Sequence, residues 1–337
     1  MSIFGSARSL DRVFQHLGND PDAFRRWFRE LAERDAHQAA RALDGRYLSF
    51  PVLFLLLGEI PSLIETGGLS QPILTAVRIC ELHRSGKADE LTAYLKLQDS
   101  EVVRQVAKWM LETGHDWNAP AEIAEEYDAA LDLAVALLVC ECNDNTELPI
   151  IADLIFKRAN NGKHLHNLVW YFFQSYNPEA VRIIAGRLIS NDPSEREFAK
   201  KLLGLSGENS ADPGGPTDPY RQYEDYMRWL DDNSNALYFT GQTLQMTSDP
   251  EPLKADLGAK YLCKAISPRD RTWVEPLNEQ ECNCLDNFRK LTDKEKEVLA
   301  AFSSSLYRNN RRVWEQWIAL QPDIQIRTAM TLLGDFL

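Results

Sequence analysis

Hydrophobic residues recur at helical spacing along most of the chain. In several separate segments the apolar positions follow one another at i, i+3 and i+4, which is the pattern of a helix with one buried face. These segments are 102–110, 181–189, 198–203, 257–262, 298–306 and 314–318. Strict alternation of apolar and polar residues, which indicates half-buried strands, is nearly absent. The pattern therefore predicts an all-α fold.

One helical run, at residues 121–142, changes character halfway along. Its second half, 133–140, contains no polar residue, and a helix that is apolar all round is buried on every side. Its first half is acidic, which suits the positive N-terminal end of a helix dipole. The acids are Glu122, Glu125, Glu126, Asp128 and Asp132. We expect this helix to begin at the surface with an acidic face and to end in the core.

A shorter apolar run covers residues 52–57 and extends loosely to 64. Proline and glycine interrupt it, and it is much shorter than the roughly 20 apolar residues that cross a membrane. It is therefore predicted to be a buried core helix. No apolar signal segment follows the first residues. The six cysteines are accordingly expected to be reduced thiols in the cytoplasm.

Four predicted helix openings share a capping pattern. Asp20, Asp99, Asn177 and Asp249 are each followed by an early acid and by a basic residue at the sixth position, with starts 79, 78 and 72 residues apart. Asp192 opens a looser version. The spacing is near twice a unit of about 36–40 residues, close to the length of two-helix repeats. Internal repeats are one interpretation, and independently capped helices are the other, because any well-capped helix favours these residues.

With these openings the chain resembles HEAT-like helical repeats. The resemblance rests on the segments that open at Asp99, Asn177 and Asp192, each followed by an amphipathic helix with a small residue inside it. It implies a right-handed, HEAT/armadillo-like α-solenoid. In HEAT proteins a turn aspartate and an arginine on the second helix tie neighbouring units together. Asp99 with Arg104, and Asn177 with Arg182, could take that role here.

A segment rich in glycine, proline, serine and aspartate, residues 206–219, divides the chain. Such a composition is typical of an exposed linker or long loop. We expect a helical repeat domain over 1–205, with the HEAT-like resemblance mainly at 70–205. A smaller helical domain over 220–337 is expected to pack against the repeats or to continue them.

Acidic residues outnumber basic ones, and the formal net charge is −13. Residues 101–150 alone hold 11 acidic and 2 basic side chains. The balance argues against a uniformly basic nucleic-acid-binding protein. The acidic part of the run at 121–142 is either a solvated helix face or a docking surface for a basic partner, because a concentrated field steers association.

Basic and aromatic residues interleave at 24–29 and at 307–314. Such segments can bind phosphate and stack bases, and some HEAT-like DNA glycosylases have a basic concave face. Amphipathic helices with an aromatic core face and a basic solvent face also explain them. The candidate arginines are Arg25, Arg26, Arg308, Arg311 and Arg312.

Few residues form a pattern that indicates chemistry. The pairs Cys140–Cys142 and Cys282–Cys284 could hold zinc only if the two segments met, and residues two apart on a helix point in different directions. Free thiols and a redox pair are the alternatives. The chain lacks a Gly-x-Ser-x-Gly nucleophile motif and phosphate-binding glycine loops. We therefore single out no catalytic residue and expect no metal or cofactor.

The sequence favours a non-catalytic scaffold or adaptor that binds a protein partner on a curved helical surface. An immunity protein or chaperone for a basic partner, such as a nuclease toxin, would be a special form of it. Two alternatives stay open: a HEAT-like nucleic-acid-binding enzyme such as a DNA glycosylase, and a metalloprotein that uses the cysteine pairs. No membrane partner is expected, and the net charge disfavours nucleic acid.

Overall fold

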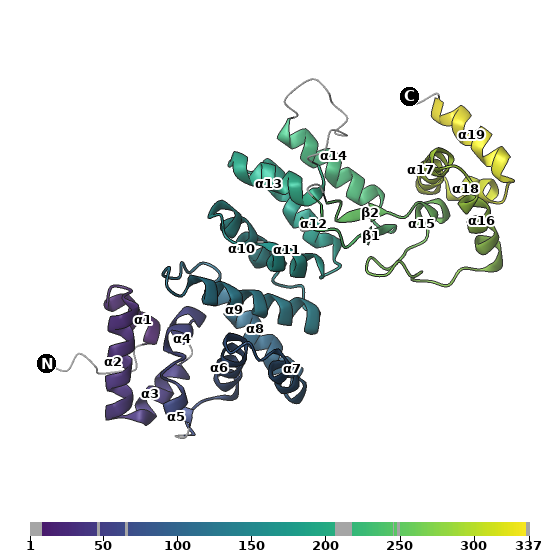
Figure 1. Ribbon diagram of the computed structural model, residues 1–337. Helices are drawn as coiled ribbons and strands as arrows, with labels where there is room; N and C mark the ends of the chain where they lie inside the picture. The colour runs from purple at the N-terminus through teal and green to yellow at the C-terminus, as the bar shows by residue number, and fades with distance from the viewer. Residues whose placement is uncertain are drawn as a thin grey trace. The chain divides into compact units, whose positions relative to one another are not determined.

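The computed structural model describes residues 9–45, 48–64, 67–205, 218–244, 246–247 and 250–334. This part of the chain is mostly helical, which confirms the all-α class in its broad sense. The chain divides into two compact units, Met1–Ser175 and Tyr176–Leu337. Figure 1 labels their elements. None of the described helices is long and apolar enough to cross a membrane.

The described part of the first unit is built from helices. They are α1 (Leu10–His16), α2 (Pro21–Arg34), α3 (Ala36–Leu43), α4 (Phe50–Leu56), α5 (Pro61–Ile64), α6 (Gln71–Arg84), α7 (Ala88–Leu97), α8 (Ser100–Gly114), α9 (Ala124–Ala136), the π-helix η1 (Leu137–Glu141), α10 (Leu148–Asn160) and α11 (His166–Phe173).

The described part of the second unit adds two short strands to its helices. The elements are α12 (Pro178–Ala185), the 3-10 helix η2 (Gly186–Ile189), α13 (Pro193–Leu203), α14 (Pro219–Asp232), β1 (Leu237–Phe239), β2 (Leu253–Ala255), α15 (Leu257–Leu262), α16 (Glu279–Arg289), α17 (Asp293–Asn309), α18 (Arg311–Ile318) and α19 (Pro322–Gly334).

The capping residues of the sequence do begin helices. Asp20, Asp99, Asn177 and Asp192 are the N-caps of α2, α8, α12 and α13, and each side chain accepts a hydrogen bond from a first-turn backbone amide. These bonds satisfy amides that a helix leaves unpaired. The helices predicted from hydrophobic spacing are present as well, in α8, α12 with η2, α13, α15, α17 and α18.

The fourth opening does not begin a helix, and this part of the prediction is wrong. Asp249 itself lies outside the described residues, and the chain after it forms β2. β2 pairs antiparallel with β1, with Tyr238 opposite Lys254. Three-residue strands are too short for an alternating pattern to stand out from the sequence.

An aromatic cluster fills the centre of the first unit. Phe50 of the buried helix α4 stacks on Tyr127 of α9 at 5.4 Å between ring centroids, and Trp109 of α8 meets Phe50 edge-on at 5.9 Å. The Tyr127 hydroxyl donates to the carbonyl oxygen of Gly114 at 2.9 Å. A Cβ at Gly114 would lie 2.6 Å from that hydroxyl, so the close approach requires glycine. The apolar run at 52–57 is thus the predicted core helix.

The run predicted at 121–142 passes from the surface to the core, as its pattern indicates. α9 begins at Ala124 with exposed acids in its first turn. It continues into η1, where Leu137, Leu138 and Val139 are buried. A run that is apolar throughout gives no signal for the change to π-helical hydrogen bonding, so the sequence did not predict it.

The boundary between the units differs from the predicted division at 206–219. Residues 206–217 lie outside the described residues, and α13 and α14 on either side of them both belong to the second unit. α14 packs against α12 and η2. This packing places α13 and α14 in one unit, although the composition of the segment between them indicated a domain boundary there. The boundary falls between Ser175 and Tyr176.

Candidate functional site

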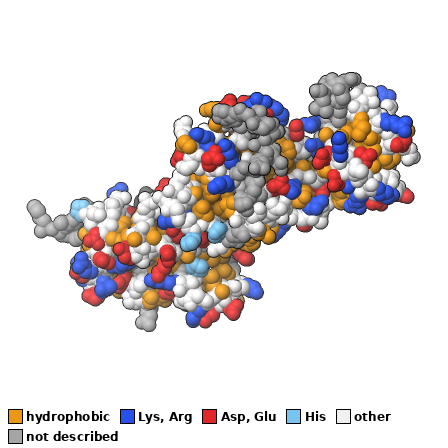
Figure 2. Space-filling view, turned by 45° about the horizontal axis from the view of Figure 1, so that its top comes forward, with side chains coloured by type: hydrophobic (Ala, Val, Ile, Leu, Met, Phe, Trp, Pro, Cys, Tyr) orange, Lys and Arg blue, Asp and Glu red, His pale blue; other side chains and the backbone are white. Residues whose placement is uncertain are grey.

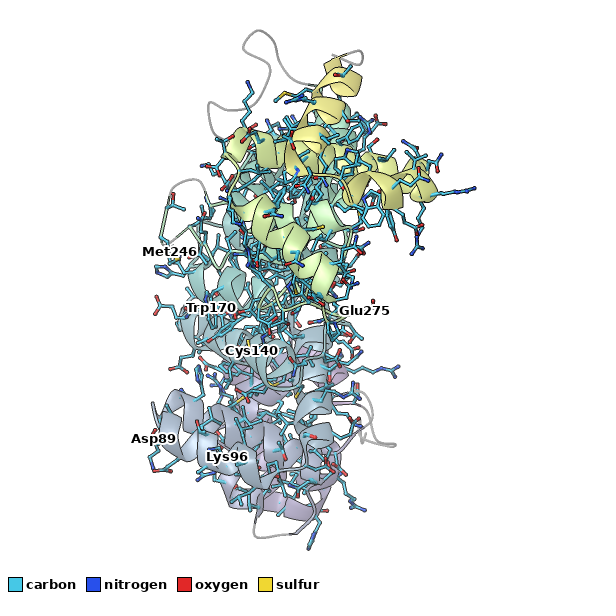
Figure 3. The ribbon with its side chains drawn as sticks, turned by 90° about the vertical axis from the view of Figure 1, so that its right-hand side faces the viewer. Asp89, Lys96, Cys140, Trp170, Met246 and Glu275 are labelled. Atoms are coloured by element: carbon cyan, nitrogen blue, oxygen red, sulfur yellow. The ribbon has the colours of Figure 1, made fainter. Side chains whose placement is uncertain are left out.

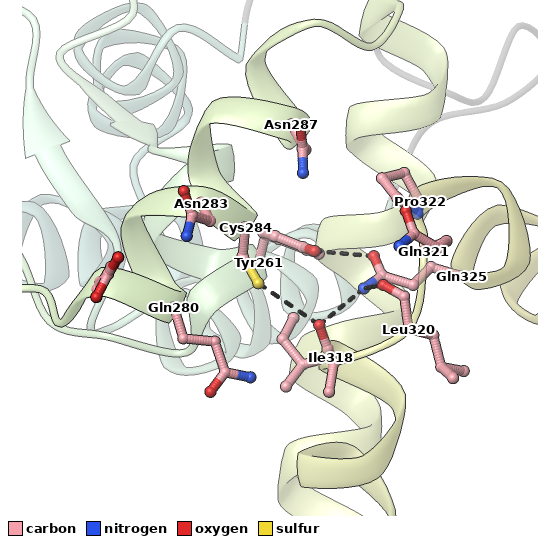
Figure 4. A pocket seen from close by; sticks show the side chains of 12 residues that line it. Tyr261, Gln280, Asn283, Cys284, Asn287, Ile318, Leu320, Gln321, Pro322 and Gln325 are labelled. Atoms are coloured by element: carbon pink, nitrogen blue, oxygen red, sulfur yellow. Dashed lines mark hydrogen bonds between the residues drawn. The ribbon is translucent and has the colours of Figure 1, made fainter.

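A groove in the second unit has a lining rich in carboxamide groups. It lies between α16 and the turn that joins α18 to α19, and its volume is about 360 Å³ (Figure 4). Such side chains combine hydrogen-bond donors and acceptors without net charge. The carboxamides of the lining are Gln280, Asn283, Asn287, Gln321 and Gln325.

Three of these side chains share one face of α16. The Asn278 side chain caps the helix by accepting from the backbone amide of Glu281 at 2.9 Å, and the Glu281 carboxylate accepts from the backbone amide of Asn278 at 2.8 Å. The cap fixes where the helix begins. Gln280, Asn283 and Asn287 then follow at i, i+3 and i+7, which places them in one row.

Gln325 forms the floor of the groove and is 1% exposed. Its Nε2 donates to the carbonyl oxygens of Ile318 at 2.9 Å and Leu320 at 3.0 Å, and its Oε1 accepts from the Tyr261 hydroxyl at 2.8 Å. The Cys284 thiol also donates to the Ile318 carbonyl, at 3.6 Å (Figure 4). These bonds fix the α18–α19 turn against α15 and α16.

The rim carboxamides remain available to a ligand. Gln280, Asn283 and Gln321 are exposed, and their side chains have no hydrogen-bond partner in the part of the chain that the structure describes. Asn287 is exposed too, and its Oδ1 accepts from Lys290 at 3.3 Å. An exposed bond of this kind is easily exchanged for one to a ligand.

The groove is weakly acidic. Glu279 is the one charged residue of its described lining. Burial raises the pKa of Tyr261 to about 12 despite the hydrogen bond to Gln325, and burial also raises the pKa of the Cys284 thiol. Both groups are therefore neutral near pH 7. The lining suits hydrogen bonding to a neutral or basic ligand.

Sequence reasoning missed this groove. The carboxamides at 280, 283 and 287 have the i, i+3, i+7 spacing of one helix face, but the hydrophobic pattern predicted no helix over this segment. The opposite wall, residues 318–325, is distant in the sequence, and only the fold brings it beside α16.

The predicted acidic face is only partly solvated, which corrects the expectation for two of its acids. Asp128 and Asp132 turn toward Arg158 of α10, whose side chain is 2% exposed. Arg158 Nη1 donates to Asp132 Oδ1 at 2.5 Å, and Nη2 donates to the Asp128 carbonyl at 2.9 Å. Lys163 also pairs with the Asp128 carboxylate, at 2.8 Å. These acids balance a buried guanidinium inside the unit.

The other three acids lie nearer the surface. Glu126 pairs with Arg84 of α6 at 2.9 Å. Glu122 and Glu125 are exposed, and no described cation forms an ion pair with either. Acidic and basic side chains are interspersed over the face drawn in Figure 2. The free part of the predicted docking surface is thus reduced to Glu122 and Glu125.

Arg104 of α8 links two carboxylates. It donates to Glu101 at 2.6 and 2.8 Å and to Asp144 at 2.8 Å. Hydrogen bonds from Arg104 and Gln105 lower the pKa of Glu101 to about 2. Desolvation raises the pKa of Asp144, but hydrogen bonds from Arg104 and Thr146 outweigh it and hold the value at about 2.

Replacing Arg104 by glutamine should flatten the acid limb of the stability profile. Glu101 and Asp144 have lowered pKa values in the folded state, so they stabilise the fold at pH values above the usual pKa of a carboxylate. This contribution disappears as the pH falls from about 4.5 to about 2. Urea unfolding of both proteins across this range measures the effect. The midpoints should differ near neutral pH and converge toward pH 2. Parallel profiles would show that Arg104 does not control these two carboxylates.

The candidate arginines are mostly engaged within the protein. Arg26 and Arg312 are exposed, and neither forms an ion pair among the described residues. The other three have internal partners: Arg25 donates to the Leu55 carbonyl at 3.0 Å, Arg308 pairs with Asp232, and Arg311 lies 3.5 Å from Glu315. Two arginines without an ion pair among the described residues, one in each unit, are a small basis for phosphate binding.

The cysteines are free thiols. Cys140 lies on η1 beside α11, which carries the partly exposed Trp170 (Figure 3). Burial raises the pKa of Cys80 to about 12, so that thiol is inert near neutral pH. Within the described ranges, no group of three or more His, Cys, Asp or Glu is placed to hold a metal ion. The metal site built from cysteine pairs stays a hypothesis.

Comparisons with protein-family models, curated proteins and solved structures found no match.

Proposed function

We propose that the protein is a non-catalytic interaction scaffold in which the α16 groove holds a segment of a protein partner. The observation that carries this proposal is the lining: five carboxamides and an apolar wall, with one carboxylate and no basic residue. Protein segments present amide groups and apolar side chains together, and this lining complements both.

Helix packing in the first unit supports an α-solenoid as the framework of the scaffold. α6 packs on α8, α8 on α9 and α9 on α11, so these helices contact near neighbours in the sequence, and α4 packs on α8 as a longer-range contact. Packing along one dimension is characteristic of repeat proteins. The bond from Arg104 to Asp144 supports a HEAT-like tie between successive elements, although Asp99 caps α8 and does not pair with that arginine.

A basic or neutral partner fits the exposed charges better than nucleic acid does. Glu279 at the groove, and Glu122 and Glu125 on the first unit, would repel phosphate groups. Basic side chains of a partner would be attracted to the same carboxylates. The exposed charges therefore favour a protein partner over nucleic acid.

The Asn283→Ala/Asn287→Ala double variant should recover about tenfold less of its protein partner than the wild type does, because two carboxamides of the row on α16, here called its rungs, can no longer hydrogen-bond to the partner. The tagged full-length protein is used to recover partners from its native cells, and bound proteins are quantified by mass spectrometry. Asp286→Ala is the matched control, since Asp286 is an exposed residue of α16 outside the lining.

Equal recovery by the double variant and the Asp286→Ala control would contradict the proposal. Recovery of nucleic acid without a stoichiometric protein would also contradict it, and would favour the exposed arginines as the binding residues.

A further inference from the structure

We infer that the α16 groove recognises the main chain of an extended peptide segment that carries a basic side chain. The inference rests on the proposed function and adds the conformation and chemistry of the bound segment. It follows from the spacing of the carboxamide row, from the free hydrogen-bonding groups and from the position of one carboxylate.

The spacing of the row matches an extended chain. A helix rises about 1.5 Å per residue, so Asn283 and Asn287 are about 6 Å apart along α16. An extended peptide repeats every two residues, or about 6.6–6.8 Å. Asn283 and Asn287 can therefore meet alternate residues of a peptide that runs along the helix. Gln280 lies about 4.5 Å further toward the N-terminus, short of a full repeat, so its longer side chain would meet the peptide beyond this pair.

The hydrogen-bonding capacity of the rungs suits a peptide backbone. A carboxamide offers an N–H donor and a carbonyl acceptor side by side, and so does each peptide unit. Gln280 and Asn283 on α16 and Gln321 on the facing turn have no side-chain partner among the described residues. Their free groups can replace water as hydrogen-bond partners of the backbone amides of an extended segment.

The floor is built to stay in place while a ligand binds. Gln325 is buried, and its amide group is fully engaged with Tyr261 and with the carbonyl groups of the α18–α19 turn. Preorganised walls reduce the ordering cost of binding. The rung residues can therefore change partners without a rearrangement of the turn.

The ends of the groove set the side-chain preference. Glu279 precedes the row and favours a lysine or arginine of the segment at that end. Leu320, which is 42% exposed, and Pro322 provide an apolar wall for a second side chain.

Nucleobases also pair with carboxamides, but the lining has no cation for their phosphates. Glu279 and Glu281 also offset the positive end of the α16 dipole.

Capped hexapeptides test this inference directly on the full chain. Pools of N-acetylated, C-amidated hexapeptides, each with one position fixed as lysine or glutamate, are titrated against the immobilised protein. At one position the lysine pool should bind about fivefold or more tightly than the glutamate pool. A defined peptide from that pool is then N-methylated at alternate amides, which removes single backbone donors. Binding should weaken about tenfold at the amides that face the rungs.

Two variants connect these effects to the groove. Asn283→Ala should weaken the unmethylated peptide about as much as methylation does, while Asp286→Ala leaves its binding unchanged. Glu279→Gln should remove the preference for lysine over glutamate and retain most of the binding. All three residues are exposed, so the variants are expected to fold.

Three results would overturn the inference: methylated and unmethylated peptides that bind equally, a lysine preference that survives in Glu279→Gln, or binding of an oligothymidylate in place of the peptides. If partner recovery still depends on Asn283 and Asn287 while methylation has no effect, the scaffold function stands and extended-backbone recognition is wrong. If neither peptides nor partner proteins depend on the groove, both are wrong.

Discussion

Arg158→Ala is expected to destabilise the first unit by about 3–5 kcal/mol. The side chain of Arg158 is 2% exposed and is bonded to Asp132 and to the Asp128 carbonyl. Its removal leaves a carboxylate without its counter-ion in a site where desolvation already raises the pKa of Asp132. Urea unfolding followed by circular dichroism, with the transition of this unit resolved, measures the loss.

The pH dependence of this variant has a defined sign. Without the guanidinium, the pKa of Asp132 in the folded state should rise further. An acid with a raised folded-state pKa destabilises the fold at pH values where it is ionised, and this cost disappears when the pH falls below that pKa. The deficit relative to the wild type should therefore shrink as the pH falls and Asp132 becomes protonated. Arg84→Ala is the control, because its exposed pair with Glu126 should be worth about 0–1 kcal/mol. Similar losses for both variants would show that Arg158 has no special role.

Gln325→Leu is expected to destabilise the second unit by about 2–4 kcal/mol, because buried polar groups lose their hydrogen-bond partner. The substitution keeps the side chain at a similar size but removes every hydrogen bond of the carboxamide. The carbonyls of Ile318 and Leu320 and the hydroxyl of Tyr261 would then lose a buried partner. A buried polar group left without a partner costs about 1–3 kcal/mol. The Ile318 carbonyl keeps its bond from Cys284 and Leu320 is 42% exposed, so the total is close to the cost of one or two such groups. Chemical denaturation of the full chain measures the change.

A double-mutant cycle separates this network from simple packing. Tyr261→Phe should cost less in the Gln325→Leu background than in the wild type, because its hydroxyl has already lost its partner there. Gln321→Leu, at an exposed position of the same turn, should change stability by no more than about 0.5 kcal/mol. Additive effects of the two substitutions would contradict a shared network beneath the groove.

Local signals in the sequence predicted much of the helical structure. A cap such as Asp99 acts on backbone amides two residues away, and an apolar run such as 133–140 indicates burial without knowledge of its neighbours. Both features depend on adjacent residues alone. The strand β2 gave no such signal, because its three residues pair with a segment that lies beyond a loop.

Features that depend on distant residues were not predictable in the same way. The acids at 128 and 132 have the spacing of a solvated face, and only the approach of α10 shows that they balance Arg158. The groove combines a carboxamide row on α16 with a turn that Gln325 holds together. The row was readable from the sequence, but nothing local indicated that another segment would face it.

Site-specific photo-cross-linking is the measurement that decides whether the groove holds a protein segment. A photoreactive phenylalanine analogue replaces Gln280, at the end of the rung row, and in a parallel protein it replaces Asp286 on the same helix. Cross-linked peptides from native cells are then sequenced by mass spectrometry. We expect position 280 to capture one contiguous segment of a protein partner, with a lysine or arginine near the cross-link, and position 286 to capture little. Equal capture at the two positions, or adducts with nucleic acid alone, would contradict a peptide-binding scaffold.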